Sequence, residues 1–144
     1  MTDSPNVDLV RSIYAGWERG DWSSAAWADE QVEFVAAEGP WAGSVAGKPA
    51  MAHTWREWLE AWEDARATPD AFHDLGDGKV LALHTWNARG KASGLAVERM
   101  EAKSAVLFHV SDGKVTKLVA YQDRERAFAD LGLTPEGKAN GPSG

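Results

Sequence analysis

Residues 104–133 read SAVLFHVSDGKVTKLVAYQDRERAFADLGL, and the rest of the chain can be placed from this stretch. Two runs rich in β-branched residues flank Asp112-Gly113, the dipeptide that most readily supplies the two positive φ angles of a tight hairpin turn. The stretch therefore predicts a long antiparallel hairpin. A short helix should follow, with Asp123 able to cap its start and Gly132 in position to end it.

The register of this hairpin decides which side chains share a face. A two-residue turn predicts one largely apolar face with a polar end, and Asp123 lies next in line beyond it. That face is expected to carry Ser104, Val106, Phe108, Val110, Val115, Lys117, Val119 and Tyr121. The other face carries Leu107, His109, Thr116 and Leu118, and because this set is too apolar to be left bare it predicts a homodimer. A one-residue bulge would exchange these assignments.

Composition limits the classes of function. The 144 residues fit one domain, expected over residues 1–133, with a flexible tail of Gly, Pro and polar residues over 134–144. A net charge of −7 argues against a nucleic-acid partner, which would require clustered Lys and Arg. The absence of cysteine, of a signal-peptide start and of an apolar run of about 18 residues favours a cytoplasmic protein without a membrane partner.

No motif indicates a metal or a cofactor. The four histidines are scattered without the spacing of known metal sites, and no Gly-rich phosphate loop occurs. Eight tryptophans are the compositional oddity. So many large rings with one N–H each predict a wide aromatic core, an aromatic-lined cavity or a surface for self-association.

Helices come first along the chain and strands follow, which is the order of an α+β domain. The periodicity predicts helices after Ser4-Pro5, over Trp22–Ala28 and from Lys48-Pro49, and strands over Gln31–Ala37, Thr68–Asp77, Lys79–Asn87 and Ala96–Val110. Tyr14 and Trp17 lie on the apolar stripe of the first helix. The third helix carries the clearest stripe, which consists of Met51, Trp55, Trp58 and Trp62.

Three segments together resemble the SnoaL-like family of the nuclear-transport-factor-2-like superfamily: YAGWERGDW, VEFVAAEGPWAGSVAGKPAM and FHVSDGKVTKLVAYQDRERAFADLGL. The resemblance implies a cone-shaped, curved antiparallel sheet wrapped on a long helix, with two N-terminal helices and a short C-terminal helix. It also implies a pocket between sheet and helix, and frequent homodimers. The relatives include ketosteroid isomerases, polyketide cyclases, limonene epoxide hydrolases and non-catalytic binding domains, so the fold alone does not give the function.

The catalytic residues of these relatives are only partly present. Phe34 and Val106 occupy the positions of the general base and of the oxyanion-hole acid of the isomerases, and Tyr14 lies one place from their helical Tyr. Steroid isomerisation is therefore not expected.

The epoxide hydrolases are matched at one position of three. His84 and Trp86 stand where those enzymes have an Arg and an Asp, whereas Asp123 matches their second Asp. If the chain is instead similar to the polyketide cyclases, Asp123 is again the candidate acid or base.

Two hypotheses follow for a small hydrophobic organic ligand. In the first, cofactor-free acid–base chemistry uses Asp123, with His84 as its partner and Tyr14 or Tyr121 as a hydrogen-bond donor. The expected ligand-binding residues are Trp17, Trp55, Trp58, Trp86, Val106, Phe108 and Tyr121. In the second, the domain is a non-catalytic binding or association module. Asp123 then only caps the last helix, and His84 and the tryptophans are core residues.

Overall fold

The computed structural model describes residues 5–21, 26–37, 43–60, 62–90 and 99–132. This part of the chain forms three helices and six strands. In chain order they are α1 (Pro5–Glu18), β1 (Ala28–Ala36), β2 (Gly43–Ala46), α2 (Lys48–Leu59), β3 (Trp62–Gly76), β4 (Lys79–Gly90), β5 (Arg99–Ser111), β6 (Lys114–Tyr121) and α3 (Arg124–Leu131).

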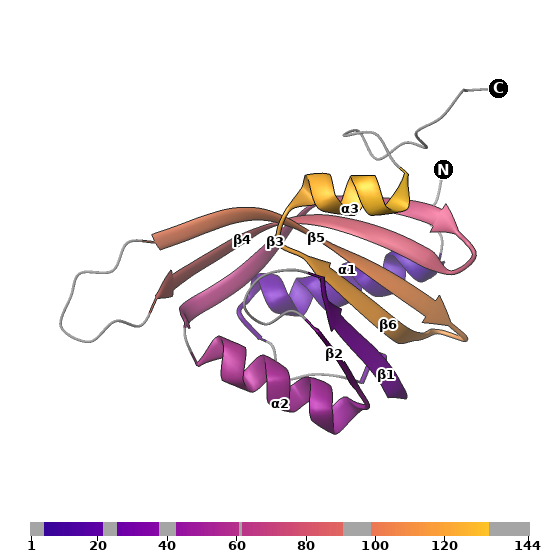
Figure 1. The fold of residues 1–144 in the computed structure, drawn as a ribbon, viewed down its shortest axis with the longest axis horizontal. Helices are drawn as coiled ribbons and strands as arrows, with labels where there is room; N and C mark the ends of the chain where they lie inside the picture. Colours follow the sequence, from indigo (N-terminus) through magenta and orange to yellow (C-terminus); the bar gives the residue numbers. More distant parts are fainter. Residues whose placement is uncertain (1–4, 22–25, 38–42, 61, 91–98, 133–144) are drawn as a thin grey trace.

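The six strands form one curved sheet in the order β2-β1-β6-β5-β4-β3 (Figure 1). Neighbouring strands are antiparallel except β1 and β6, which are parallel. The curved sheet is thus antiparallel as expected in all pairs but this one, which makes it a mixed sheet. The parallel pair arises because β6, which closes the hairpin with β5, also pairs with the first strand of the chain.

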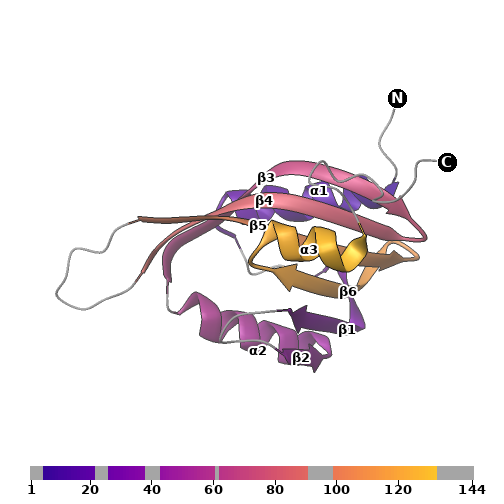
Figure 2. The same ribbon diagram turned by 45° about the horizontal axis from the view of Figure 1, so that its top comes forward.

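Helices cover both faces of the sheet. α1 packs on β3 and β4, and α2 contacts β1, β2 and β3, which belong to both ends of the strand order. α3 lies on the opposite face, against β5 and β6 (Figures 1 and 2). The curved sheet that the resemblance implied is thus confirmed, and its inner face is covered by α1 and α2. None of the helices described is long and apolar enough to cross a membrane.

Two apolar clusters result, one on each face. The inner core lies between the sheet and α1 and α2, and its larger buried side chains include Val10, Ile13, Tyr14, Trp17, Val32, Met51, Val80, Trp86, Val106, Phe108, Val115 and Leu118. The outer core lies under α3 and consists of Leu81, Leu83, Ala105, Leu107, Tyr121, Ala127 and Phe128. Strand alternation creates this division, because Val106 and Phe108 point inward while Ala105 and Leu107 point outward.

The hairpin turn is confirmed, but its register is not. Asp112 and Gly113 both have positive φ, at 52° and 75°, as a two-residue turn requires. Val110 pairs with Val115, but His109 pairs with Lys117, so Thr116 is an extra residue in β6. This bulge turns the later part of β6 over.

The bulge changes the expected faces of the hairpin. Val106, Phe108 and Val110 remain with Val115 in the inner core, whereas Tyr121 and Val119 belong to the outer cluster. The predicted second face is divided, because Leu118 is in the inner core and Leu107 lies under α3. The homodimer therefore stays a prediction, but the single apolar face from which it was predicted does not form.

Other element boundaries differ from the expectation. Trp62 begins β3 instead of continuing the stripe of α2, because the helix ends at Leu59. Of the predicted helix over Trp22–Ala28, residues 22–25 lie outside the described residues, and Ala28 begins β1. The link over residues 91–94 and the tail 134–144 also lie outside them.

Candidate functional site

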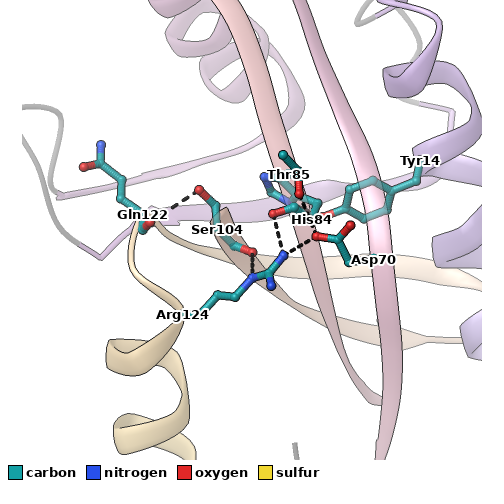
Figure 3. A network of polar contacts seen from close by, with 7 residues as sticks. All are labelled: Tyr14, Asp70, His84, Thr85, Ser104, Gln122 and Arg124. Carbon is teal, nitrogen blue, oxygen red and sulfur yellow. Dashed lines mark hydrogen bonds and ion pairs between the residues drawn. The ribbon is translucent and has the colours of Figure 1, made fainter. Parts of the chain in front are cut away.

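Two of the predicted catalytic residues meet in the inner core. Tyr14 comes from α1 and His84 from β4, and the Tyr14 hydroxyl lies 2.7 Å from Nδ1 of His84 (Figure 3). Tyr14 is fully enclosed, and His84 is 7% exposed. The apolar stripe of α1 directs Tyr14 onto the sheet, and the alternation of β4 turns His84 toward it.

The hydrogen-bond inventory assigns the direction of this bond. Among the described residues His84 Nδ1 is the hydrogen-bond partner of the buried Tyr14 hydroxyl. Because a buried hydroxyl hydrogen without an acceptor is unfavourable, we assign the hydroxyl as the donor. Nδ1 is then the acceptor, and the neutral ring carries its hydrogen on Nε2.

The Nε2 atom of His84 has no hydrogen-bond partner among the described residues. In the same part of the chain, no fully buried side-chain nitrogen or oxygen lacks a partner. Nε2 is therefore not completely enclosed by protein. It is the one polar group of the pair with a hydrogen to offer to a bound molecule.

Burial keeps both groups neutral. The pKa of His84 is lowered from 6.5 to about 4: desolvation by burial is the main cause, the positive charge of Arg124 adds to it, and Asp70 opposes both. Desolvation likewise raises the pKa of Tyr14 well above 10, against the effect of Arg124 and together with that of Asp70. At neutral pH the pair is a phenol bonded to a neutral imidazole.

Aromatic side chains surround the pair. The ring of Tyr14 makes edge contacts with Trp17, Phe72 and Phe108, at centroid separations of 4.9, 5.8 and 6.1 Å. Trp86, two residues along β4 from His84, packs edge-on against Trp62. On the inner face of the sheet, the surroundings of the pair are therefore apolar.

The expected ligand-binding residues divide between the two cores. Trp17, Trp86, Val106 and Phe108 are buried in the inner core, and Trp55 is partly buried against it. Tyr121 belongs to the outer core and does not share a face with His84. Trp58 lies in α2, and its side chain falls outside the part of the chain that the structure describes.

Asp123 is at the surface as the N-cap of α3. Its side chain accepts a hydrogen bond from the backbone N–H of Glu125 at 2.9 Å, and the residue is exposed. Gly132 ends the helix in the left-handed conformation, with φ of 68°. The capping reading of Asp123 is confirmed, whereas the contact between Asp123 and His84 that the catalytic hypothesis needed is not among those the structure gives for His84.

Two charged residues near the pair were missed by the sequence analysis. Arg124, the first residue of α3, forms an ion pair with Asp70 of β3 and donates to the backbone carbonyl of His84 at 2.9 Å (Figure 3). Asp70 also accepts from the Thr85 hydroxyl at 2.8 Å. The available signal was Pro69-Asp70 inside a predicted strand, because proline within a strand marks an edge or a bulge.

Among the described residues, no group of three or more His, Cys, Asp or Glu side chains is placed to hold a metal ion. The chemistry that the site offers is that of a neutral imidazole N–H donor supported by a buried phenol.

Comparisons with known proteins agree with the fold. Residues 10–118 match the SnoaL-like domain. Curated proteins give no match. The structure of TerC co-crystallised with polyporic acid is 22% identical, with a TM-score of 0.70 over 89% of this chain and 98% of that one.

Two further solved structures are similar. A protein from Mesorhizobium loti described as a SnoaL-like polyketide cyclase is 24% identical, with a TM-score of 0.64 over 84% of this chain and 99% of that one. A protein from Catenulispora acidiphila with a ketosteroid-isomerase-like fold, in complex with trimethylamine, is 14% identical, with a TM-score of 0.67 over 90% and 95%. At these identities the likeness concerns the fold.

Proposed function

Because this chain belongs to the SnoaL-like domain family, we propose that it binds a small, mostly apolar carbonyl compound against the inner face of its sheet and promotes cofactor-free enolisation of it. The observation that carries this proposal is the buried Tyr14–His84 hydrogen bond, which leaves the Nε2 hydrogen of His84 available. The aromatic rings around the pair favour an apolar ligand, and the free N–H favours one with an oxygen acceptor.

His84 acts as a hydrogen-bond donor to the carbonyl oxygen of the ligand. When a proton leaves the neighbouring carbon, negative charge develops on that oxygen, and a donor in an apolar site stabilises this charge more than it does in water. Tyr14 strengthens the donor by holding the imidazole in one tautomer. Since the pKa of Tyr14 is raised, the phenol keeps its own proton and the pair works without complete proton transfer.

The proposal restricts the substrate. In the part of the chain that the structure describes, no carboxylate is hydrogen-bonded to Tyr14 or His84. The proposal assigns proton removal to water or to a group of the substrate itself, which favours compounds with an acidic C–H, such as β-dicarbonyl compounds. A protein that only binds the enol form, without accelerating its formation, is the second candidate, and the same missing carboxylate favours it.

Binding and turnover can be tested separately. Saturable changes in tryptophan emission on titration with a cyclic β-diketone, or with polyporic acid, which TerC was crystallised with, report binding. Deuterium exchange at the acidic carbon, followed by NMR, reports enolisation. A neutral N–H donor does not attract a cation, so trimethylamine should give no response that depends on His84.

Tyr14→Phe and His84→Gln are the informative variants. We expect each to lower exchange by at least about tenfold, since a single donor to a developing oxyanion contributes a factor of this order or more. Arg126→Gln, which removes a charge from the exposed face of α3, is the control and should behave as the wild type. Binding that disappears in His84→Gln without any wild-type exchange would identify a binding module. An absent response to the whole panel would contradict both candidates.

A further inference from the structure

Arg124 connects four elements from the outer face of the sheet. It is the first residue of α3, its Nε donates to the carbonyl of Ser104 in β5 at 3.2 Å, and one Nη donates to the carbonyl of His84 in β4 at 2.9 Å. The same Nη bonds to a carboxylate oxygen of Asp70 in β3. The side chain of Arg124 is 20% exposed, so this is a half-buried ion pair.

The sheet is irregular at this point. Pro69 faces His84 in the register of β3 and β4, and the register shifts between Pro69 and Ala71, which leaves Asp70 as an extra residue. Proline has no N–H to donate to the neighbouring strand. The guanidinium of Arg124 supplies hydrogen bonds where the strand pairing around His84 is interrupted, and Asp70 neutralises the charge that it brings.

We propose that Arg124 and Asp70 are positioning residues of the Tyr14–His84 pair: they hold the backbone of His84 from behind the sheet and place two opposed charges near its imidazole. This inference concerns the site of the proposed function, but its test requires neither ligand nor turnover.

Four elements contribute the titratable and charged groups around the imidazole and its neighbouring ion pair. Tyr14 of α1 is a neutral phenol. Arg124 of α3 disfavours protonation of the ring, and Asp70 of β3 favours it. Burial raises the pKa of Asp70, but the hydrogen bonds from Thr85 and Arg124 and the charges of Arg124 and of Lys103 of β5 outweigh it, so the pKa is lowered.

Removing either member of the ion pair therefore has an effect of opposite sign. Without Asp70, the positive charge of Arg124 is uncompensated and opposes protonation of His84 more strongly. Without Arg124, the carboxylate is uncompensated and favours it. The ion pair as a whole is nearly neutral. Removing both residues should therefore give His84 a pKa between those of the two single variants.

The experiment is an NMR titration of the His84 ring carbons in the ligand-free protein, between neutral pH and the acid limit of the fold. Arg124→Gln is expected to raise the pKa of His84 by roughly half a pH unit or more, and Asp70→Asn to lower it by a similar amount. The double variant should lie between them. Arg126→Gln, two residues along the same helix with an ion pair to Asp130, is the matched control and should leave His84 unchanged.

A merely structural role predicts a different pattern. If Arg124 and Asp70 only hold the fold together, each variant loosens the site and exposes His84, so both move its pKa upward toward 6.5. Equal upward movement, or no movement in either variant, would overturn the inference.

Arg124→Lys separates position from charge. Lysine keeps the positive charge but cannot donate to two carbonyls and a carboxylate in the same fixed geometry. The pKa of His84 should then stay near the wild-type value, while the backbone amide shifts around Ser104 and His84 change. If those shifts also stay in place, the positioning part of the inference is wrong. Failure of every ligand to bind would contradict the proposed function and leave these outcomes unaffected.

Discussion

His84 makes the stability of the fold depend on pH. Its pKa is about 4 in the folded protein and about 6.5 in the unfolded chain, so between these values the unfolded chain binds more protons. The free energy of unfolding therefore contains a contribution from neutral His84 that is fully present above pH 6.5 and is lost as the pH falls to 4. It amounts to about 3 kcal/mol. The lowered pKa of Asp70 acts in the same direction.

The measurement is the difference between two proteins. Urea unfolding of the wild type and of His84→Gln at several pH values between 4 and 7 cancels the carboxylates that both share. The wild type should lose stability more steeply with acid than the variant. Parallel curves would mean that His84 is not buried as a neutral group.

The sequence predicted Tyr14 and His84 as site residues but did not predict the hydrogen bond between them. Tyr14 was identified on the apolar stripe of a helix and His84, 70 residues away, from its position in a predicted strand. A stripe on a helix does not say which strand it will meet. Asp123 was chosen because it matched a catalytic position, whereas local capping determines where it lies. Arg124 could not be distinguished by sequence from the charged residues beside it. The position of its partner Asp70 depends on a bulge that forms only when β3 pairs with β4.

Gly76 and Gly78 of the turn between β3 and β4 differ in the space available for a side chain. Gly76 and Gly78 have φ of 83° and 77°, so either would be strained as alanine, by about 1–2 kcal/mol. A Cβ on Gly76 would meet nothing within 4 Å, but on Gly78 it would lie 2.4 Å from the carbonyl oxygen of Val110. We expect Gly78→Ala to destabilise the protein clearly more than Gly76→Ala in thermal unfolding. Equal losses would show that β5 can move away from the turn.

The cap of α3 can be separated from any role of Asp123 in chemistry. Asp123→Ala should cost about 1 kcal/mol, and Asp123→Asn only a fraction of this, because asparagine also accepts the bond from the Glu125 N–H. If Asp123 is only a cap, Asp123→Asn also leaves ligand binding and deuterium exchange at wild-type levels. A loss of exchange without a loss of stability would restore Asp123 as a catalytic residue.

The hairpin shows what local sequence decides and what it does not. Asp112-Gly113 determines a two-residue turn through its backbone preferences, and this was predicted. The extra residue Thr116 corresponds to the one-residue bulge that remained open as an alternative, because nothing in the turn requires or forbids it. Its effect is to direct Leu118 inward and Tyr121 outward, so that β6 supplies apolar side chains to both cores.

The molecule as a whole has one sheet and two separate cores. The inner core contains or contacts Trp17, Trp27, Trp55, Trp62 and Trp86, which are the tryptophans whose side chains the structure describes. The outer core contains none among the described residues. The emission of these five tryptophans therefore reports on the face of the sheet that carries Tyr14 and His84.

This asymmetry gives a test of the whole arrangement. Phe108 of the inner core stacks on Trp17 at 6.2 Å, and Phe128 lies in the outer core on α3. Truncating a buried phenylalanine to alanine costs about 3–5 kcal/mol, with less expected for Phe128, because the short helix α3 can detach while the rest of the fold remains. Both variants should unfold at lower urea concentrations.

Only Phe108→Ala should change the emission of the folded protein, since it removes a ring from the surroundings of Trp17 and leaves a cavity beside Tyr14. Phe128→Ala should leave that emission unchanged, although it loosens the helix from which Arg124 reaches His84. The titration of His84 would then shift without an optical signal. Emission changes of equal size in both variants would mean that a change in the outer core also alters the inner core. The two cores would then not be independent in solution.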